Sequence, residues 1–163
     1  WIDETDVHQG LKFDGRIAED FKLATGTFVS VGPLRAKIIA AGAPYIQDVV
    51  LTGINLKEVG AMVFPTQAVR PLSGLDVSVP MADVLSSAPV IAQFQKVLNE
   101  LAVHATGSAS RIARMCLLAE PPTIDRSEVT DKGSINQRAV LTHRAQTVAA
   151  LHDDTLHSII KPQ

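Results

Sequence analysis

The sequence has little that could cross-link it, anchor it in a membrane or attract nucleic acid. Its 163 residues include one cysteine, Cys116, so an internal disulfide and a cysteine-based zinc site are excluded. No apolar run is long enough to span a membrane. With 15 basic and 17 acidic residues the net charge is −2, which lacks the basic surplus that binding to nucleic-acid phosphates requires. We therefore expect a soluble, cytoplasmic protein with no membrane or nucleic-acid partner.

Motifs for several common chemistries are also missing. The five histidines lack the i, i+4 spacing of zinc proteases, and there is no Walker loop, dinucleotide-binding glycine fingerprint or serine nucleophile elbow. No metal site is predicted. Cys116 lies in an apolar pattern, where a buried and inert thiol is expected rather than a nucleophile. The first residue is Trp1 instead of methionine, so we expect the sequence to be a fragment of a longer protein.

Hydrophobic residues make up 46% of the chain, and their spacing predicts one α+β domain. Short apolar runs predict a central sheet of about three strands at residues 46–51, 59–64 and 112–119. Helices are predicted from Pro33, from Pro89 and from about Asn136, with a small hairpin over residues 11–23. The residues expected to be buried are Ile38, Val49, Val63, Phe94, Leu98, Leu101 and Leu117.

The chain divides into a hairpin segment, residues 1–30, and an α/β body, residues 31–163, which together form one domain. The proline-rich stretch 65–89 is predicted to be a loop with short helices at most. Residues after His152 are expected to fray. The last helix is expected to bury Val140, Leu141, Ala145, Val148 and Leu151.

Two polar segments are not explained by the fold alone. Residues 13–28 can be interpreted as a hairpin, and residues 128–138 as the capped start of a helix. These structural interpretations leave open why Gly26 follows a β-rich run and why Lys132 stands in a polar turn.

The same two segments resemble the adenylate-forming (ANL) superfamily, which includes acyl-CoA synthetases and luciferases. The run FDGRIAEDFKLATGTFVSVGPLR, residues 13–35, resembles the hinge, the glycine loop and the start of the following helix in that family. The run AEPPTIDRSEVTDKGSINQRAVL, residues 119–141, resembles its terminal lysine motif. The order and spacing of these motifs agree with the family, and the sequences of the two segments are most similar to those of feruloyl-CoA synthases. The resemblance implies the C-terminal lid domain of such an enzyme.

The resemblance further implies an acid–thiol ligase that works in two half-reactions. A carboxylic acid, with a hydroxycinnamate such as ferulate as the implied substrate, reacts with ATP and its Mg²⁺ to give acyl-adenylate and pyrophosphate. The lid then rotates about a hinge, and the thiol of CoA displaces AMP to give acyl-CoA. The partners of the lid would be its own N-terminal domain, the acid, ATP and CoA. Residues 1–163 alone would be inactive, because most of the ATP and acid site belongs to the other domain.

By this resemblance, Lys132 is the catalytic lysine that contacts the acid carboxylate and the ATP phosphate during adenylation. A positioned ammonium neutralises the charge that develops at the α-phosphate; the alternative is a solvated turn lysine. Many relatives place a glycine before this lysine, whereas here Asp131 precedes it and Gly133 follows it. Arg16 matches the arginine that holds the nucleotide ribose, the alternative being a surface arginine of the hairpin.

Ala18 and Glu19 match the hinge, which needs only a backbone that tolerates rotation. Gly26, Thr27 and Phe28 match the loop that lines the tunnel for the pantetheine arm of CoA, where glycine allows close approach of the backbone. A plain β-turn is the alternative for the loop, and core packing is the alternative for Phe28. A function of another class also stays open, a non-catalytic α/β module for ligand sensing or oligomerisation.

Overall fold

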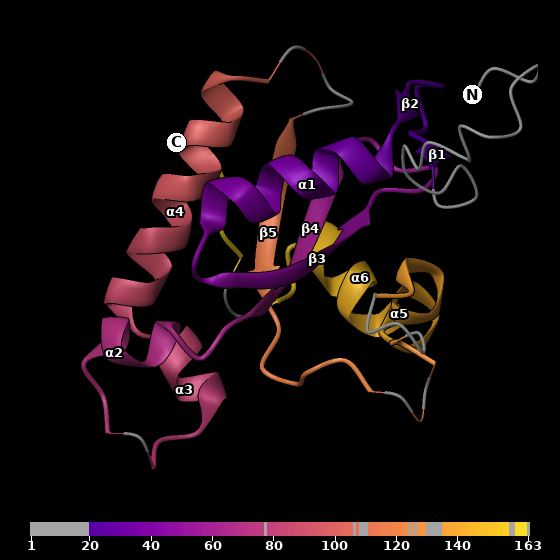
Figure 1. Cartoon of the computed structure of the whole chain (residues 1–163). Coiled ribbons are helices and arrows are strands. Elements are labelled where there is room, and N and C mark those ends of the chain that lie inside the picture. The colour runs from indigo at the N-terminus through magenta and orange to yellow at the C-terminus, as the bar shows by residue number, and fades with distance from the viewer. Residues whose placement is uncertain are drawn as a thin grey trace, which may run out of the picture.

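The computed structural model of the chain has the predicted α+β fold (Figure 1). It describes residues 20–76, 78–105, 107, 111–123, 125, 127–129, 135–156 and 159–162. The elements are β1 (Phe21–Lys22), β2 (Phe28–Val29), α1 (Val31–Gly42), β3 (Ile46–Thr52), β4 (Val59–Pro65), α2 (Val69–Ser73), α3 (Met81–Leu85), α4 (Ala88–Val103), β5 (Ile112–Leu117), α5 (Gln137–His143) and α6 (Ala145–His152). Within these ranges, no helix has both the length and the apolar character that crossing a membrane requires.

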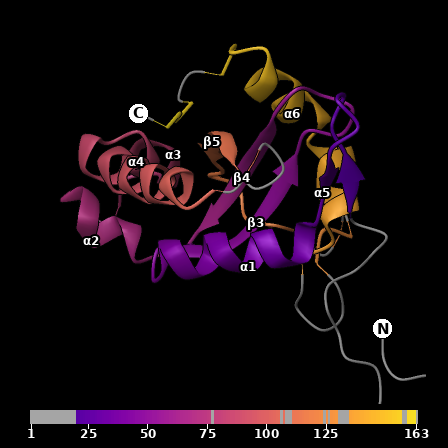
Figure 2. The same ribbon diagram turned by 90° about the horizontal axis from the view of Figure 1, so that it is seen from above.

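The central sheet has the order β3-β4-β5, as Figures 1 and 2 show. β3 and β4 are antiparallel neighbours in sequence, whereas β5 pairs in parallel with β4 after the crossover through α2, α3 and α4. Side chains alternate between the two faces of the sheet, because successive residues of a strand point to opposite sides. Val49 therefore belongs to the core under α1 and α4, and Val50 to the core under α5 and α6. The sheet is buried on both faces.

Most residues predicted to be buried are buried, but two expectations were wrong in degree. Five of them are fully buried: Ile38, Val49, Val63, Phe94 and Leu98. Leu101, near the end of α4, and Leu117, at the end of β5, are only partly buried and pack against the edge of the core. The third strand also ends at Leu117 and not at residue 119, since the chain leaves the sheet there.

The N-terminal hairpin that the structure describes joins β1 to β2, so it begins where the hairpin expected over residues 11–23 was to end. Phe21 pairs with Val29 and Lys22 with Phe28, in antiparallel register. The strand expected near residues 11–13 lies outside the described residues. Between β4 and α4, the described residues of the stretch 65–89 form only the two five-residue helices α2 and α3, as predicted for a proline-rich segment.

The predicted last helix is two helices. α5 ends and α6 begins at Arg144, whose backbone is not helical (φ −112°, ψ 29°). The side chain of Arg144 is turned into the interior toward Glu128, and this contact accounts for the break. Ala145, expected on the buried face, is exposed as a consequence, while Val140 and Leu151 are buried as predicted.

The expectation that the tail frays was wrong, because residues beyond α6 return to the sheet. The amide of Met115 donates to the carbonyl of Ile160 and the amide of Ile160 donates back, each at 2.8 Å. Lys161 Nζ lies 3.0 Å from Asp154 Oδ1. The tail thus adds an antiparallel bridge along the outer edge of β5.

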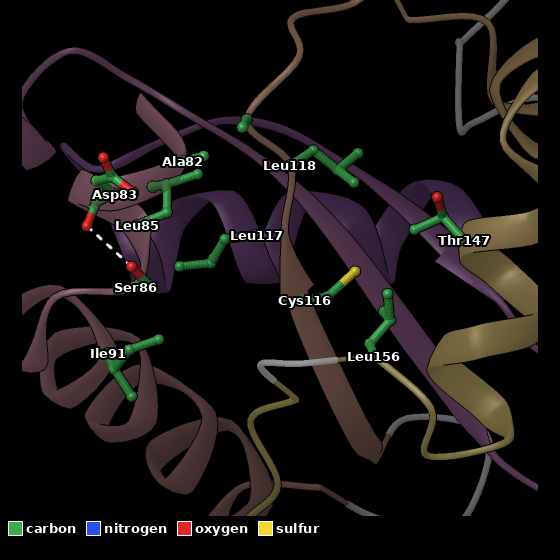
Figure 3. Close-up of a pocket in the computed structure, with 11 residues that line it drawn as sticks. Ala82, Asp83, Leu85, Ser86, Ile91, Cys116, Leu117, Leu118, Thr147 and Leu156 are labelled. Carbon is green, nitrogen blue, oxygen red and sulfur yellow. Dashed lines mark hydrogen bonds between the residues drawn. The ribbon is translucent and has the colours of Figure 1, made fainter. Parts of the chain in front are cut away.

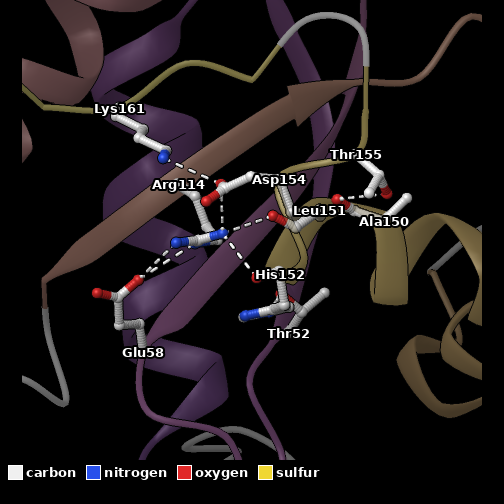
Figure 4. Close-up of polar contacts among 9 residues, drawn as sticks. All are labelled: Thr52, Glu58, Arg114, Ala150, Leu151, His152, Asp154, Thr155 and Lys161. Atoms are coloured by element: carbon white, nitrogen blue, oxygen red, sulfur yellow. Dashed lines mark hydrogen bonds and ion pairs between the residues drawn. The ribbon is translucent and has the colours of Figure 1, made fainter.

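Arg114 of β5 fastens the end of α6 to the sheet (Figure 4). Its Nη1 donates to the carbonyls of Leu151 and His152, at 2.7 and 3.1 Å, and to Asp154 Oδ1 at 2.9 Å. Its Nη2 lies 3.0 Å from Glu58 Oε2. The last carbonyls of a helix have no partner within the helix, so a cation at this position satisfies them and favours the negative end of the helix dipole.

Candidate functional site

The loop predicted to line the tunnel is a tight turn closed by backbone hydrogen bonds. Gly26 donates its amide to the Leu23 carbonyl at 2.8 Å, and the Leu23 amide donates to the Thr27 carbonyl at 2.9 Å. Gly26 has φ +85°, a conformation that costs a residue with a side chain about 1–2 kcal/mol. A Cβ at Gly26 would meet no atom within 4 Å, so the turn presents its backbone to open space.

A second loop, residues 53–58, supports this turn from behind. Ala24 donates its amide to the Leu56 carbonyl at 2.8 Å, and Asn55 donates to the Lys22 carbonyl at 3.0 Å. Gly53 begins the supporting loop with φ +129°, and a Cβ there would lie 2.5 Å from the Glu58 carbonyl oxygen. The Gly26 turn is therefore held on the sheet by a loop that itself depends on a glycine.

Replacing Gly53 by alanine is expected to lower the free energy of unfolding by about 2–3 kcal/mol, because both the backbone angle and a backbone contact resist a Cβ. Gly26→Ala is the matched control, with the same kind of angle but open space around the new methyl group. Its expected cost is about 1 kcal/mol. Urea unfolding of the 163-residue chain, followed by circular dichroism, measures both values. Equal losses would contradict this description of the supporting loop.

The turn and its supporting loop expose apolar side chains. Phe28 is 52% exposed, which rules out the core alternative for this residue, and Ile54 and Leu56 are 49% and 37% exposed. They are three of the five large hydrophobic residues that are exposed in the described part of the chain. Exposed apolar residues gathered on two adjoining loops are typical of a surface that contacts another protein or a ligand.

The predicted hinge and ribose residues, Arg16, Ala18 and Glu19, lie outside the described residues. The description begins at Asp20, whose Oδ1 accepts a hydrogen bond from the Val31 amide at 2.9 Å. This bond satisfies one of the free amides at the start of α1, where Ser30 makes no side-chain cap. The chain just after the expected hinge is therefore tied to α1, and the hairpin and α1 can move as one unit.

Lys132 also lies outside the described residues, but both ends of its segment are described. Val129 and Ile135 form an isolated antiparallel bridge, and the Asn136 amide donates to the Glu128 carbonyl at 2.8 Å. Asn136 then caps α5 by accepting a hydrogen bond from the Ala139 amide. The predicted helix start after the lysine motif is thereby confirmed.

A hollow of about 430 Å³ adjoins the Gly26 turn. It is lined by Ala24, Asn55, Leu56, Lys57, Glu58, Arg114, His152 and Asp153. His152 Nε2 lies 2.7 Å from the Thr52 hydroxyl, and burial, with a smaller contribution from the charge of Arg114, lowers the pKa of His152. Its imidazole thus carries no charge near neutral pH and acts as a hydrogen-bonding partner of β3. No group of three or more possible metal ligands is present among the described residues.

Another hollow, of about 450 Å³, lies between α3, β5 and α6 and contains none of the predicted site residues (Figure 3). Cys116 faces it from β5, with Ile91 on one side and Leu156 on the other. Burial raises the pKa of the Cys116 thiol to about 12, so the thiolate that a nucleophile needs does not form near neutral pH. The expectation of an inert, buried thiol is confirmed.

Three contacts that shape this region have no local signal in the sequence. The bond from Val31 to Asp20, the cluster around Arg114 and the pair of Glu128 with Arg144 all join residues that are at least ten positions apart. Local sequence rules on capping and periodicity reach only about four residues along the chain. No signal of that kind could have found these contacts.

Three solved structures with a similar fold contain adenylation domains. The chain resembles the A domain of carboxylic acid reductase from Segniliparus rugosus, in complex with AMP and a co-purified carboxylic acid, with 20% identity, a TM-score of 0.60 and 86% of this chain covered. The A-PCP didomain of the Segniliparus rugosus enzyme in complex with AMP has 21% sequence identity and a TM-score of 0.60, and the match covers 85% of this chain. The adenylation domain of a carboxylate reductase from Mycobacterium chelonae has 20% sequence identity and a TM-score of 0.64, again with 85% of this chain covered.

These likenesses concern the fold, and the chain covers only 21%, 18% and 20% of the three proteins. A comparison with curated proteins finds no match. The sequence itself matches a family over residues 20–155, from the hairpin to the end of α6 and the residues just after it. This range contains the Gly26 turn, the sheet and the segment with Lys132. The chain belongs to the family of AMP-binding enzyme C-terminal domains.

Proposed function

We propose that the chain is the C-terminal domain of an ATP-dependent acid–CoA ligase. The carboxylate of the acid attacks the α-phosphate of ATP and pyrophosphate leaves, which gives acyl-adenylate. The CoA thiol then loses its proton and attacks the acyl carbon, and AMP leaves. The observation that carries the proposal is the family match over residues 20–155, which include Gly26 and Lys132, the residues assigned to these two steps.

In this proposal Lys132 supplies the ammonium for adenylation and Arg16 holds the ribose of ATP. Ala18 and Glu19, within the hinge and hairpin segment of residues 1–30, form the hinge to an N-terminal domain that holds most of the ATP, with its Mg²⁺, and the acid. Residues 31–163 form the body of the lid. The bond from Asp20 to α1 supports this hinge position, since it makes the chain after residue 19 part of the rotating body.

Gly26, Thr27 and Phe28 line the tunnel for the pantetheine arm of CoA after rotation. Support comes from the open space in front of Gly26 and from the rigid loop behind it. The exposed side chains of Phe28, Ile54 and Leu56 then contact the N-terminal domain or the thiol substrate. A hydroxycinnamate such as ferulate is the proposed acid, on the basis of the likeness of residues 13–35 and 119–141 to feruloyl-CoA synthases.

A second candidate is favoured by the similar solved structures, which are adenylation domains of carboxylic acid reductases. The acyl group would then pass to a thiol carried on another part of the protein instead of to free CoA. Both candidates share the adenylation step and the role of Lys132. The ligand-sensing or oligomerisation module is the weaker alternative, because it gives no reason for a match to AMP-binding enzymes.

The test is an assay of the full-length enzyme with ATP, CoA and a panel of carboxylic acids that includes ferulate. We expect AMP and acyl-CoA to form together, with hydroxycinnamates among the best substrates. Acyl-adenylate without transfer to free CoA would favour the tethered thiol. Absence of pyrophosphate release with every acid would contradict the proposal.

The isolated chain, residues 1–163, is expected to be folded and catalytically silent. Its described residues form a sheet with cores on both faces, while the proposed site for ATP and acid lies on another domain. Circular dichroism checks the fold, and a sensitive thioester assay with ATP, CoA and ferulate checks the activity. Acyl-CoA formed by the isolated chain would show that this is not a lid domain.

A further inference from the structure

A carboxylate and a guanidinium are paired in the interior beside α5 and α6. Glu128 is 0% exposed, and the side chain of Arg144 is 8% exposed. Arg144 Nε donates to Glu128 Oε2 at 2.9 Å, and its Nη2 donates to Oε1 at 3.2 Å. This is the two-pronged geometry in which a guanidinium binds a carboxylate most strongly. The pairing with Arg144 lowers the pKa of Glu128, so the carboxylate is charged near neutral pH.

The surroundings of the pair satisfy its remaining hydrogen-bonding groups. The amide and hydroxyl of Thr123 donate to Glu128 Oε1 at 3.1 and 3.3 Å. Arg144 also donates to the carbonyls of Glu120 and Pro121, at 3.2 and 3.1 Å. Its guanidinium carbon lies 5.1 Å from the centre of the Phe64 ring on β4. The pair therefore connects the sheet, the junction of α5 and α6 and the segment after β5.

The backbone of Glu128 lies at the base of the segment that carries Lys132. Its amide donates to Thr123, and its carbonyl accepts from the amide of Asn136. The next residue, Val129, forms a β-bridge with Ile135, so the two residues that flank residues 130–134 are paired with each other. Lys132 is the middle residue of these five.

The other end of the segment is also tied to the sheet. Gln137, the first residue of α5, accepts a hydrogen bond from the Leu51 amide of β3 at 3.0 Å. β3 is an edge strand of the central sheet, so this side chain satisfies a backbone group that no strand reaches. Both ends of residues 130–134 are thus fixed to buried parts of the domain.

A buried ion pair is seldom the most stable way to fill an interior, since apolar residues of similar size do as well or better. Its advantage is geometric specificity, because two parallel hydrogen bonds hold the guanidinium and the carboxylate in one relative orientation. A lysine that must reach two anionic groups depends on such a fixed base, since small displacements of a catalytic group cost large factors in rate.

We propose that Glu128 is a positioning residue for adenylation: its carboxylate, clamped by Arg144, fixes the base of the segment that carries Lys132. This inference rests on the proposed function. Glu128 acts through Lys132 and touches neither ATP nor the acid.

The experiment measures pyrophosphate release by the full-length enzyme in the pre-steady state, with ATP and ferulate, for Glu128→Gln in two backgrounds. In the wild-type background we expect a loss of about tenfold in the rate constant at saturating ATP, without a similar rise in the ATP concentration needed for half saturation. In the Lys132→Ala background we expect no further loss, because a residue that acts through Lys132 has no effect once the lysine is gone.

Asp48→Asn is the matched control. It breaks the pair of Arg35 with Asp48, whose side chains are 25% and 12% exposed, and which joins α1 to β3 away from the lysine segment. We expect it to leave pyrophosphate release at the wild-type rate. Transfer from a supplied acyl-adenylate to CoA is expected to stay unchanged in both variants.

Three results would overturn the inference: an equal loss for Glu128→Gln in the Lys132→Ala background, equal slowing of both half-reactions, or an equal loss for Asp48→Asn. If Glu128→Gln does not fold, Thr123→Val gives the answer, since it removes only one hydroxyl donor from Oε1. Its expected loss is about twofold to threefold in adenylation alone, and no loss overturns the inference. Lys132→Ala without effect on adenylation would instead overturn the proposed function.

Discussion

Replacing Lys132 by alanine is expected to slow adenylation in the full-length enzyme by about a hundredfold or more. The lysine stands in the segment whose ends, Val129 and Ile135, are paired on the domain. Removing one positioned charge from the developing negative charge of a transition state costs about 3–4 kcal/mol. Transfer of a supplied acyl-adenylate to CoA needs no such charge and is expected to proceed at nearly the wild-type rate. Rapid-quench measurement of pyrophosphate release and of thioester formation checks the two steps separately.

Lys132→Arg is the control for charge alone in this experiment. Its guanidinium keeps the positive charge but is larger and planar, so the two anionic groups are no longer met by one compact ammonium. We expect it to recover only part of the lost rate. An enzyme in which Lys132→Ala slows both half-reactions equally would assign the lysine to structure, and the proposal of a rotating lid would lose its main support.

The second large effect is expected at Gly26, in the opposite half-reaction. Gly26→Trp is expected to slow thioester formation from a supplied acyl-adenylate by about a hundredfold, by displacing the thiol from its line of attack. Pyrophosphate release is expected to stay nearly unchanged. A Cβ at this position meets no atom within 4 Å, so the larger side chain starts from open space.

Gly26→Ala separates the effect of size from the effect of backbone strain. Both substitutions force a side chain onto a backbone with φ +85°, but alanine adds only a methyl group. We expect Gly26→Ala to lose less than about tenfold in thioester formation. Equal losses for alanine and tryptophan would place the effect in the turn itself, and unchanged transfer with tryptophan would remove Gly26 from the tunnel.

The architecture was largely predictable because the strands are short, apolar and bounded by turn formers. The runs that begin at Ile46, Val59 and Ile112 are the three strands of the sheet. Proline at the start of α4 and its apolar stripe with Phe94 and Leu98 marked the longest helix. Each of these signals is local, and each element that carries one is present.

The break at Arg144 and the docked tail could not be predicted in the same way. The apolar spacing of Val140 and Leu151 continues across Arg144, so periodicity alone predicts one helix. The partner that turns Arg144 inward, Glu128, comes from a polar stretch rich in turn formers, where a fully buried charge is not expected. Polar residues likewise favoured a frayed end after His152, although Arg114 holds that end from another strand.

The candidate site was predictable only in part for a related reason. Gly26 and Lys132 were found by their likeness to a family, whereas the contacts that fix their surroundings involve residues far away in sequence. The supporting loop at Gly53 is far from Gly26 in sequence, and Glu128, although close to Lys132, is held by Arg144 from beyond α5. Predicting them would have required the fold first.

The most direct test of the lid proposal is the ratio of two single-turnover rate constants, adenylation over thioester transfer, measured on the same samples of full-length enzyme. With a rotating lid, we expect Lys132→Ala to lower this ratio and Gly26→Trp to raise it, each by about a hundredfold. A ratio that stays at the wild-type value in both variants, or that moves in the same direction in both, would contradict it.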